Sequence, residues 1–234
     1  MLDTMPNTIQ TQMTELPGNG STVPAFLAKP DGDGPFPGVI VVQEWWGLDD
    51  HIKDVAQRFA QEGFVALAPD LYHGVVAKEP NQAQKLMMAL DMNRASAELV
   101  RATDVLASQP YLRGRGIGAI GFCMGGGLAL TLACDSPHIR AVAPFYGVNP
   151  NPLSKLGSLR GPVFAVYAEH DDWASAKVRE ELRQDLERYG KLFETKVYPG
   201  TQHAFFNDTR KEVYNADAAR DAWAKALELF RKSL

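Results

Sequence analysis

The sequence lacks the features that mark several classes of protein. Only two of its 234 residues are cysteines, Cys123 and Cys134, so no disulfide framework is implied and a reducing, cytoplasmic setting is expected. Lysine and arginine do not cluster, and the net charge of −4 gives no reason to expect a nucleic-acid partner. No apolar run could cross a bilayer, and residues 1–14 lack the basic and apolar regions of a signal peptide. We therefore expect no membrane partner.

Motifs for metals and cofactors are also missing. The histidines show no metal-ligand spacing and no P-loop occurs, so no metal and no cofactor are expected. Residues 116–121 do fit the pattern G-x-G-x-x-G. A dinucleotide-binding fingerprint must follow a strand and begin a helix, whereas this stretch lies before and within a predicted strand. We therefore discount binding of NAD.

The apolar residues predict a single domain of the α/β class. A length of 234 residues with 45% hydrophobic content suits one domain, residues 1–234, with a sizeable core. Apolar, β-branched runs without alternation predict strands buried on both faces. These runs are residues 38–42, 65–68, 117–122, 141–146, 163–168 and 193–198. The expected fold is a three-layer α/β domain, with a mostly parallel central sheet and helices on both faces.

The remaining segments predict a hairpin and helices. Strands at residues 9–14 and 23–28, joined by a turn at 18–20, form an antiparallel hairpin at the start. Asp49 or Asp50 begins a helix that Gly63 ends, and residues 81–108 are helical with a break near 91–94. Asp172 is expected to begin a helix that Gly190 ends, and the last helix carries Phe230 on its apolar face.

The stretch Gly121-Phe122-Cys123-Met124-Gly125 has the layout of a nucleophile elbow, G-x-S-x-G, with cysteine in place of serine. A turn this sharp strains the backbone at the nucleophile, and glycines on either side avoid clashes. The sulfur is then exposed at the N-terminus of a helix, whose dipole favours the thiolate. Cys134 has no such frame and is interpreted as a core residue.

Cys123, Asp171 and His203 follow three predicted strands, so the three side chains should meet at the carboxyl edge of the sheet. Their order along the chain, nucleophile, acid and histidine, is that of α/β-hydrolase triads. The histidine takes the thiol proton and later protonates the leaving group, while the acid orients the histidine. Asp172 competes with Asp171 for the role of acid but suits a helix cap better. Backbone N–H groups of Trp45 and Met124 are expected to stabilise the oxyanion.

At this point the chain resembles the dienelactone hydrolase family, the carboxymethylenebutenolidase-like members of the α/β-hydrolases. Five blocks in the order of the family carry the resemblance: Val41 to Leu48, Ala66 to Tyr72, Gly121 to Gly126, Tyr167 to Asp171 and Tyr198 to Phe205. The resemblance implies cleavage of a small ester or lactone by a Cys-His-Asp triad. It also implies that Glu44 holds the resting thiol in an unproductive orientation until substrate displaces it.

The substrate is less well defined than the chemistry. Members of the family that cleave dienelactone grip its carboxylate with arginines, one of them soon after the histidine, but here the nearest arginine is Arg210. Trp46, Tyr146 and Phe205 are candidates for the substrate pocket. We expect one of Trp45 and Trp46 to lie in the core instead.

Three hypotheses follow. The first is a cysteine hydrolase of a small-molecule ester or lactone, and the second is a broad carboxylesterase or thioesterase without preference for dienelactone. The third is a catalytically silent small-molecule-binding protein on the same fold. The sequence leaves the oligomeric state and the natural substrate open.

Overall fold

In the computed structural model, residues 7–17 and 22–234 are described. Eight strands form one sheet in the order β1-β2-β4-β3-β5-β6-β7-β8 over that part of the chain. The strands are β1 (Ile9–Pro17), β2 (Thr22–Pro30), β3 (Phe36–Val42), β4 (Val65–Pro69), β5 (Leu112–Phe122), β6 (Ile139–Phe145), β7 (Val163–His170) and β8 (Phe193–Gln202). The pairs β1–β2 and β2–β4 are antiparallel, and every other pair is parallel. The prediction of a mostly parallel sheet is confirmed.

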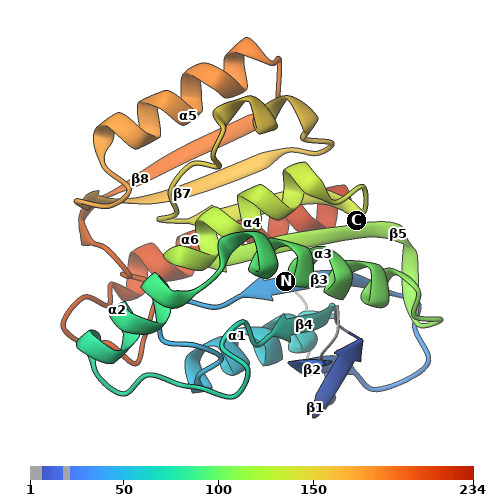
Figure 1. Ribbon diagram of the computed structural model, residues 1–234. Helices are drawn as coiled ribbons and strands as arrows, with labels where there is room; N and C mark the ends of the chain where they lie inside the picture. The colour runs from blue at the N-terminus through green and yellow to red at the C-terminus, as the bar shows by residue number, and fades with distance from the viewer. Residues whose placement is uncertain (1–6, 18–21) are drawn as a thin grey trace.

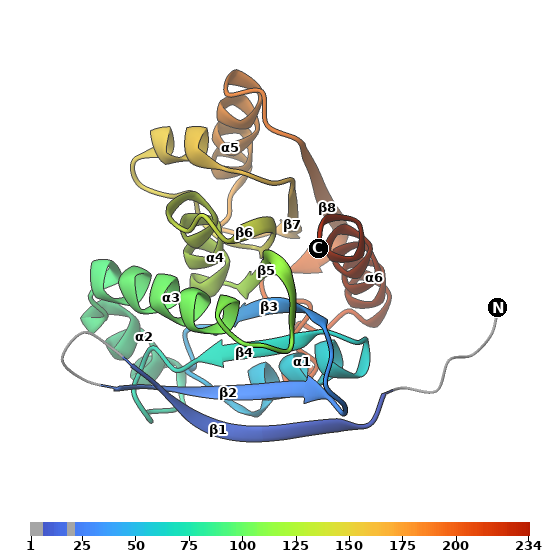
Figure 2. The ribbon, with the colours of Figure 1, turned by 90° about the vertical axis from the view of Figure 1, so that its right-hand side faces the viewer.

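Helices cover both faces of the sheet, as Figures 1 and 2 show. The helices are α1 (Asp50–Gln61), α2 (Pro80–Ala89), α3 (Met92–Ala107), α4 (Met124–Asp135), the 3₁₀ helix η1 (Leu153–Ser158), α5 (Ala176–Arg188) and α6 (Ala216–Ser233). In Figure 2, α1 and α6 lie on one side of the sheet and α2 to α5 on the other. The predicted three-layer arrangement is therefore present.

The central strands are continuous runs of buried residues because both of their faces are covered. The last four residues of β3, Val39 to Val42, are fully buried, and so are most residues of β4, β6 and β7. Helix α1 shows the other common pattern, since Ile52, Val55 and Phe59 recur on its buried face. These two patterns fix the layers of the fold.

Most predicted elements occur, with shifted ends. The helix break lies between Ala89 and Met92, and Asp49 rather than Asp50 caps α1 by accepting a hydrogen bond from the Ile52 amide. The two strands of the initial hairpin are present, but their predicted turn at 18–20 lies outside the described residues. The prediction for Asp172 as a helix cap is wrong, because Ser175 takes that place and accepts from the Val178 amide.

The carboxyl ends of the parallel strands lie at one edge of the sheet. The chain segments that leave this edge after β3, β5, β6, β7 and β8 begin with Gln43, Cys123, Tyr146, Asp171 and His203. Ligands of open α/β sheets bind at this edge. Within the described ranges, none of the helices combines the length and apolar character that crossing a membrane requires.

Candidate active site

Cys123 lies on a strained turn between β5 and α4. Its φ of 55° and ψ of −120° are rare for a residue with a side chain. Such a turn leaves no space beside it: a Cβ on Gly121 would lie 2.0 Å from the Gly125 carbonyl oxygen, and one on Gly125 would lie 2.2 Å from that of Gln43. The two glycines therefore permit the turn, and the Cys123 side chain lines a cavity of about 950 Å³.

His203 and Asp171 form a hydrogen-bonded pair beside this turn. His203 Nδ1 lies 2.8 Å from Asp171 Oδ2, while Asp171 Oδ1 accepts from the backbone amides of Trp173 and Ala174 at 2.9 Å each. Burial alone would raise the pKa of Asp171, but the hydrogen bonds from His203 and these amides hold it below its usual value. Asp171 is thus a fixed carboxylate that orients the imidazole.

His203 interacts with Cys123 as well as with Asp171. Burial by itself would lower the pKa of the imidazole, but its interactions with Asp171 and Cys123 outweigh burial and raise the pKa to about 10. Both His203 and Cys123 line the cavity. The arrangement favours an imidazolium beside the sulfur, with Asp171 on the opposite ring nitrogen.

Glu44 is the second carboxylate of the site, and its surroundings differ from those of Asp171. It is buried after β3, where Oε2 accepts a 2.8 Å hydrogen bond from Asn207 Nδ2 and Oε1 has no partner among the described residues. Burial raises the pKa of Glu44, and nearby His51 and Asn207 only partly oppose this. Glu44 therefore holds a proton more readily than an exposed glutamate does.

Two residues that line the cavity with Cys123 have backbone N–H groups without an acceptor among the described residues. Met124 is the first residue of α4, where an amide has no partner within the helix. Trp45 follows Glu44 in the loop after β3, and over the described ranges its amide donates to no protein acceptor. Both residues line the cavity that holds Cys123. They occupy the positions that the sequence predicted for oxyanion donors.

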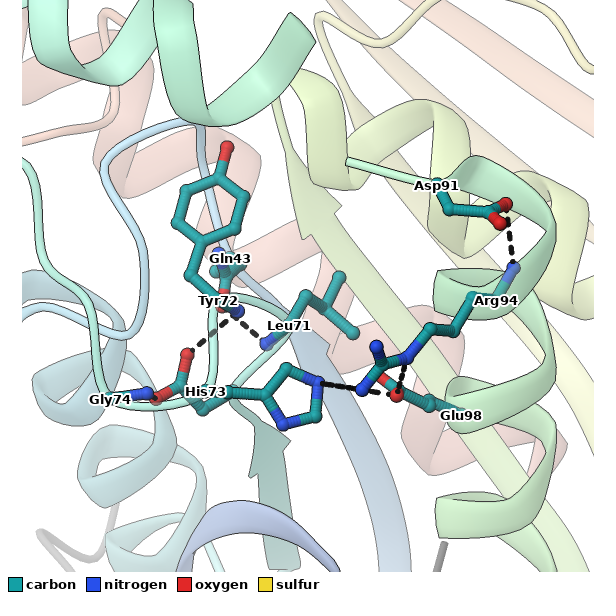
Figure 3. Close-up of polar contacts among 9 residues, drawn as sticks. Gln43, Leu71, Tyr72, His73, Gly74, Asp91, Arg94 and Glu98 are labelled. Atoms are coloured by element: carbon teal, nitrogen blue, oxygen red, sulfur yellow. Dashed lines mark hydrogen bonds and ion pairs between the residues drawn. The ribbon is translucent and has the colours of Figure 1, made fainter. Parts of the chain in front are cut away.

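The loop after β4 contacts the side chain of Met124. Asp70 Oδ1 and Oδ2 accept from the amides of Tyr72 and Gly74, and the Tyr72 hydroxyl donates to Met124 Sδ at 3.6 Å. Figure 3 shows how His73 points from this loop to α3, where Arg94 and Glu98 meet it. Gln43 also accepts from the Leu71 amide at 3.0 Å, so the loops after β3 and β4 are joined.

The predicted pocket residues do not all reach the cavity. Trp46 and Tyr146 line it, and the Tyr146 ring lies 4.9 Å from the His203 ring between centroids. Trp45 lines it too, so the expectation that one of the two tryptophans lies in the core is wrong. Phe205 is fully buried and packs against Tyr146 and Tyr198 away from the cavity. A φ of 68° at Ala204 turns the chain after His203, which accounts for this difference.

Several residues that line the cavity were not predicted from the sequence, and Trp173 and Arg210 are among them. Trp173 lies two residues after Asp171, lines the cavity and is largely exposed. Arg210 also lines the cavity, although it lies beyond the expected position for an arginine after the histidine. Its guanidinium is paired with Glu212 at 2.8 Å and lies 5.9 Å from the Trp46 ring centroid.

A metal site has no support in the described parts of the chain, where no three His, Cys, Asp or Glu side chains gather as ligands would. The stretch 116–121 lies within β5, and the helix begins only after Cys123. The geometry that a dinucleotide fingerprint requires is therefore missing at that stretch.

Comparison with known proteins identifies the family of this chain. The sequence profile of the "Dienelactone hydrolase family" matches residues 23–234. The chain belongs to the dienelactone hydrolase family. It is 37% identical to "Putative carboxymethylenebutenolidase" from Saccharolobus solfataricus, over 92% of this chain and 95% of the relative. It is also 37% identical to "Protein usf" from Aquifex pyrophilus, over 95% of this chain and 99% of the relative.

A solved structure of the dienelactone hydrolase family has the same fold. The crystal structure of "Putative Dienelactone Hydrolase from Klebsiella pneumoniae subsp. pneumoniae MGH 78578" superposes with a TM-score of 0.88 at 31% identity. The match covers 97% of this chain and 100% of the solved one. The protein therefore has the α/β-hydrolase fold of a family of hydrolases.

Proposed function

We propose that this protein hydrolyses a small carboxylic ester or lactone, with Cys123 as nucleophile, His203 as acid and base, and Asp171 as the orienting acid. One observation carries the proposal: Cys123 occupies a strained turn at the N-terminus of α4 and shares a cavity with His203, whose other ring nitrogen is bound to Asp171. Nucleophile, base and orienting acid in this relation are the requirements of covalent acyl transfer.

In the first half of the reaction, Cys123 Sγ attacks the ester carbonyl and a tetrahedral intermediate forms. The N–H groups of Trp45 and Met124 would stabilise its negative oxygen. When the C–O bond breaks, His203 gives its proton to the departing alkoxide, and an acyl-thioester remains on Cys123. Before the attack, the interactions with Asp171 and Cys123 raise the pKa of His203 to about 10, so the imidazole enters the reaction protonated at neutral pH.

In the second half, His203 is neutral after its proton transfer and accepts a proton from water. The resulting hydroxide attacks the thioester carbonyl, and collapse of the intermediate releases the carboxylic acid and the Cys123 thiolate. The proton on His203 restores the imidazolium–thiolate pair, and the thiolate returns to the resting thiol when it takes a proton from Glu44. Asp171 keeps the same tautomer and ring orientation through both halves, because backbone amides fix its other oxygen.

Glu44 would control the resting nucleophile. Its buried carboxyl group has one oxygen bound to Asn207 and the other without a partner among the described residues, so it can accept or give a proton inside the cavity. The raised pKa suits exchange of a proton with the Cys123 thiol. Substrate that displaces the carboxyl group would release the thiolate.

The charges of the cavity favour a neutral ester over an anionic one. Lys155 and Arg210 are the lysine and arginine that line it in the described chain, and each is already paired with a carboxylate. An anionic lactone would have to compete with Glu212 for Arg210. This observation supports the second hypothesis, an esterase without preference for dienelactone.

Turnover of a substrate panel tests the proposal. The purified protein should hydrolyse neutral aryl acetates with a higher kcat/KM than dienelactone, and Cys123→Ala should abolish both activities. Unchanged turnover in the Cys123→Ala variant would exclude Cys123 as the nucleophile. A strong preference of the unsubstituted protein for dienelactone would be consistent with ester hydrolysis by Cys123. It would refute the proposal that the preferred substrates are neutral.

A further inference from the structure

The cavity continues from Cys123 along the whole length of α4. Its lining on this helix consists of one stripe at helical spacing: Met124, Gly127, Leu128, Thr131 and Asp135. Because α4 has 12 residues, at about 1.5 Å per residue the stripe covers roughly 17 Å. The cavity therefore extends well beyond the place where an ester bond would react.

Helix α3 supplies the opposite wall of this extension, which we name the α3–α4 groove. Figure 1 shows α3 and α4 lying next to each other, and they are in contact. The α3 side of the groove is also a single stripe: Met92, Asn93, Ser96, Ala97 and Val100. At the end far from Cys123, the Ser96 hydroxyl lies 3.4 Å from Asp135 Oδ2.

The α3–α4 groove is mostly apolar, and its charges are matched internally. Met87, Val100 and Leu128 contribute hydrocarbon surface to the cavity. At the far end, Lys155 Nζ donates to both oxygens of Asp135 at 3.0 and 2.8 Å. A ligand bound in the groove therefore needs no charged group to neutralise Lys155 or Asp135.

Apolar side chains also stand exposed where the cavity opens. Trp173, Met92 and Val148 line the cavity and are 62%, 49% and 46% exposed. Exposed apolar groups gathered around a cavity mark a surface that binds apolar ligands. A volume of about 950 Å³ lies near the upper end of the usual range for ligand pockets. A small lactone would leave most of it empty.

We propose that the substrates are neutral esters with an extended apolar arm, and that this arm lies in the α3–α4 groove. The proposal rests on the proposed ester hydrolysis and adds the substrate class. The reacting carbonyl lies at Cys123, and the arm extends along α4 toward Ser96 and Asp135. Each methylene that enters the groove leaves water, which strengthens binding of the substrate and of the transition state.

Two series of esters test the arm: p-nitrophenyl esters from acetate to decanoate, and acetates of alcohols from ethanol to decanol. In one of the series, kcat/KM should rise by about three- to fourfold per added methylene until the groove is filled. Ser96→Trp fills the far end of the groove and should lower the ratio of long-chain to short-chain kcat/KM at least about 10-fold. Ser108→Trp, the same change at the exposed C-cap of α3 outside the cavity, should leave that ratio unchanged.

A flat or falling dependence on chain length in both series would overturn the proposal, and so would a ratio that Ser96→Trp leaves intact. Absence of turnover with every ester, acetate included, would instead refute the proposed function. The groove would still be tested in that case, because calorimetry with neutral alkyl methyl ketones of short and long chain measures binding without reaction. Tighter binding of the long ketone, lost in Ser96→Trp, would support the groove, and equal affinities would refute it.

Discussion

The two cysteines lie at opposite ends of helix α4, in opposite chemical surroundings. Cys123 precedes the first turn, faces the cavity and lies beside His203. Cys134 lies in the last turn, is buried in the core, and burial raises the pKa of its thiol to about 12. The helix dipole favours negative charge at the first end and disfavours it at the second.

The contrast teaches that the reactivity of a thiol here comes from position. The N-terminal end of α4 brings together a strained backbone, free amides, a histidine and an opening to the cavity. The C-terminal end has none of these and uses its sulfur as a small apolar group.

The largest effect is expected from the acid that orients His203. Asp171→Asn removes the charge that holds the imidazolium, so kcat should fall about 1,000-fold. Asp172→Asn changes the neighbouring carboxylate, which was the rival candidate in the sequence, and should alter kcat less than about twofold. Steady-state kinetics on an aryl acetate distinguish the two variants. Equal losses in both would mean that Asp171 has no special role.

The difference between the thiols can be measured directly by alkylation. In the folded protein at neutral pH, iodoacetamide should modify Cys123 at least about 100-fold faster than Cys134, as judged by mass spectrometry of peptides. In urea the two rates should become similar, because both surroundings are lost. Comparable rates in the folded protein would show that the two ends of α4 do not differ as described.

The dependence of stability on pH should reveal the partner of Cys123. The folded pKa of His203, about 10, exceeds the ordinary value of 6.5, so the folded state holds an extra proton between these limits. That stability is present below pH 6.5 and is lost as the pH rises toward 10, and the full shift corresponds to about 5 kcal/mol. Urea unfolding across this range should show a smaller loss in Cys123→Ala than in the unsubstituted protein. If both proteins lose the same stability over this pH range, the raised pKa of His203 does not depend on Cys123.

A smaller effect is expected at Glu44, whose burial makes its charge unfavourable. Glu44→Gln should raise the free energy of unfolding at neutral pH by about 1 kcal/mol while esterase activity changes. The folded pKa is raised, so the unsubstituted protein loses stability as the pH rises through the folded value, and the variant does not. Glu169→Gln at an exposed site is the matched control for urea unfolding. A less stable Glu44→Gln variant would contradict this account.

The sequence predicted that Cys123, Asp171 and His203 lie at one edge of the sheet, because local rules govern their positions. A strand, a glycine-flanked turn and a helix constrain the place of Cys123, and parallel strands bring Asp171 and His203 to the same edge. The layers followed from uninterrupted apolar runs such as Val39 to Val42. These inferences depend on patterns of a few residues and on the geometry of parallel sheets.

The residues whose positions the sequence did not predict lie in loops, where the direction of the chain after a strand ends decides which side chains reach the cavity. The positive φ at Ala204 sends Phe205 into the core, and no residue type in that stretch signals such a turn. The following loop returns on itself, since the Asn215 amide donates to the Phe205 carbonyl, and so brings Arg210 to the cavity. The α3–α4 groove could not be predicted either. It depends on how α3 and α4 are rotated relative to each other, and the sequence of neither helix determines that rotation alone.

Trapping the acyl-enzyme tests the central claim most directly. The protein is mixed with a p-nitrophenyl ester, quenched in acid within the first turnover, digested and examined by mass spectrometry. The account predicts one acyl group, attached to the peptide that contains Cys123, with the Cys134 peptide unmodified. Ester turnover with no acyl group on Cys123 at any quench time, or an acyl group on another residue that is kinetically competent, would contradict it.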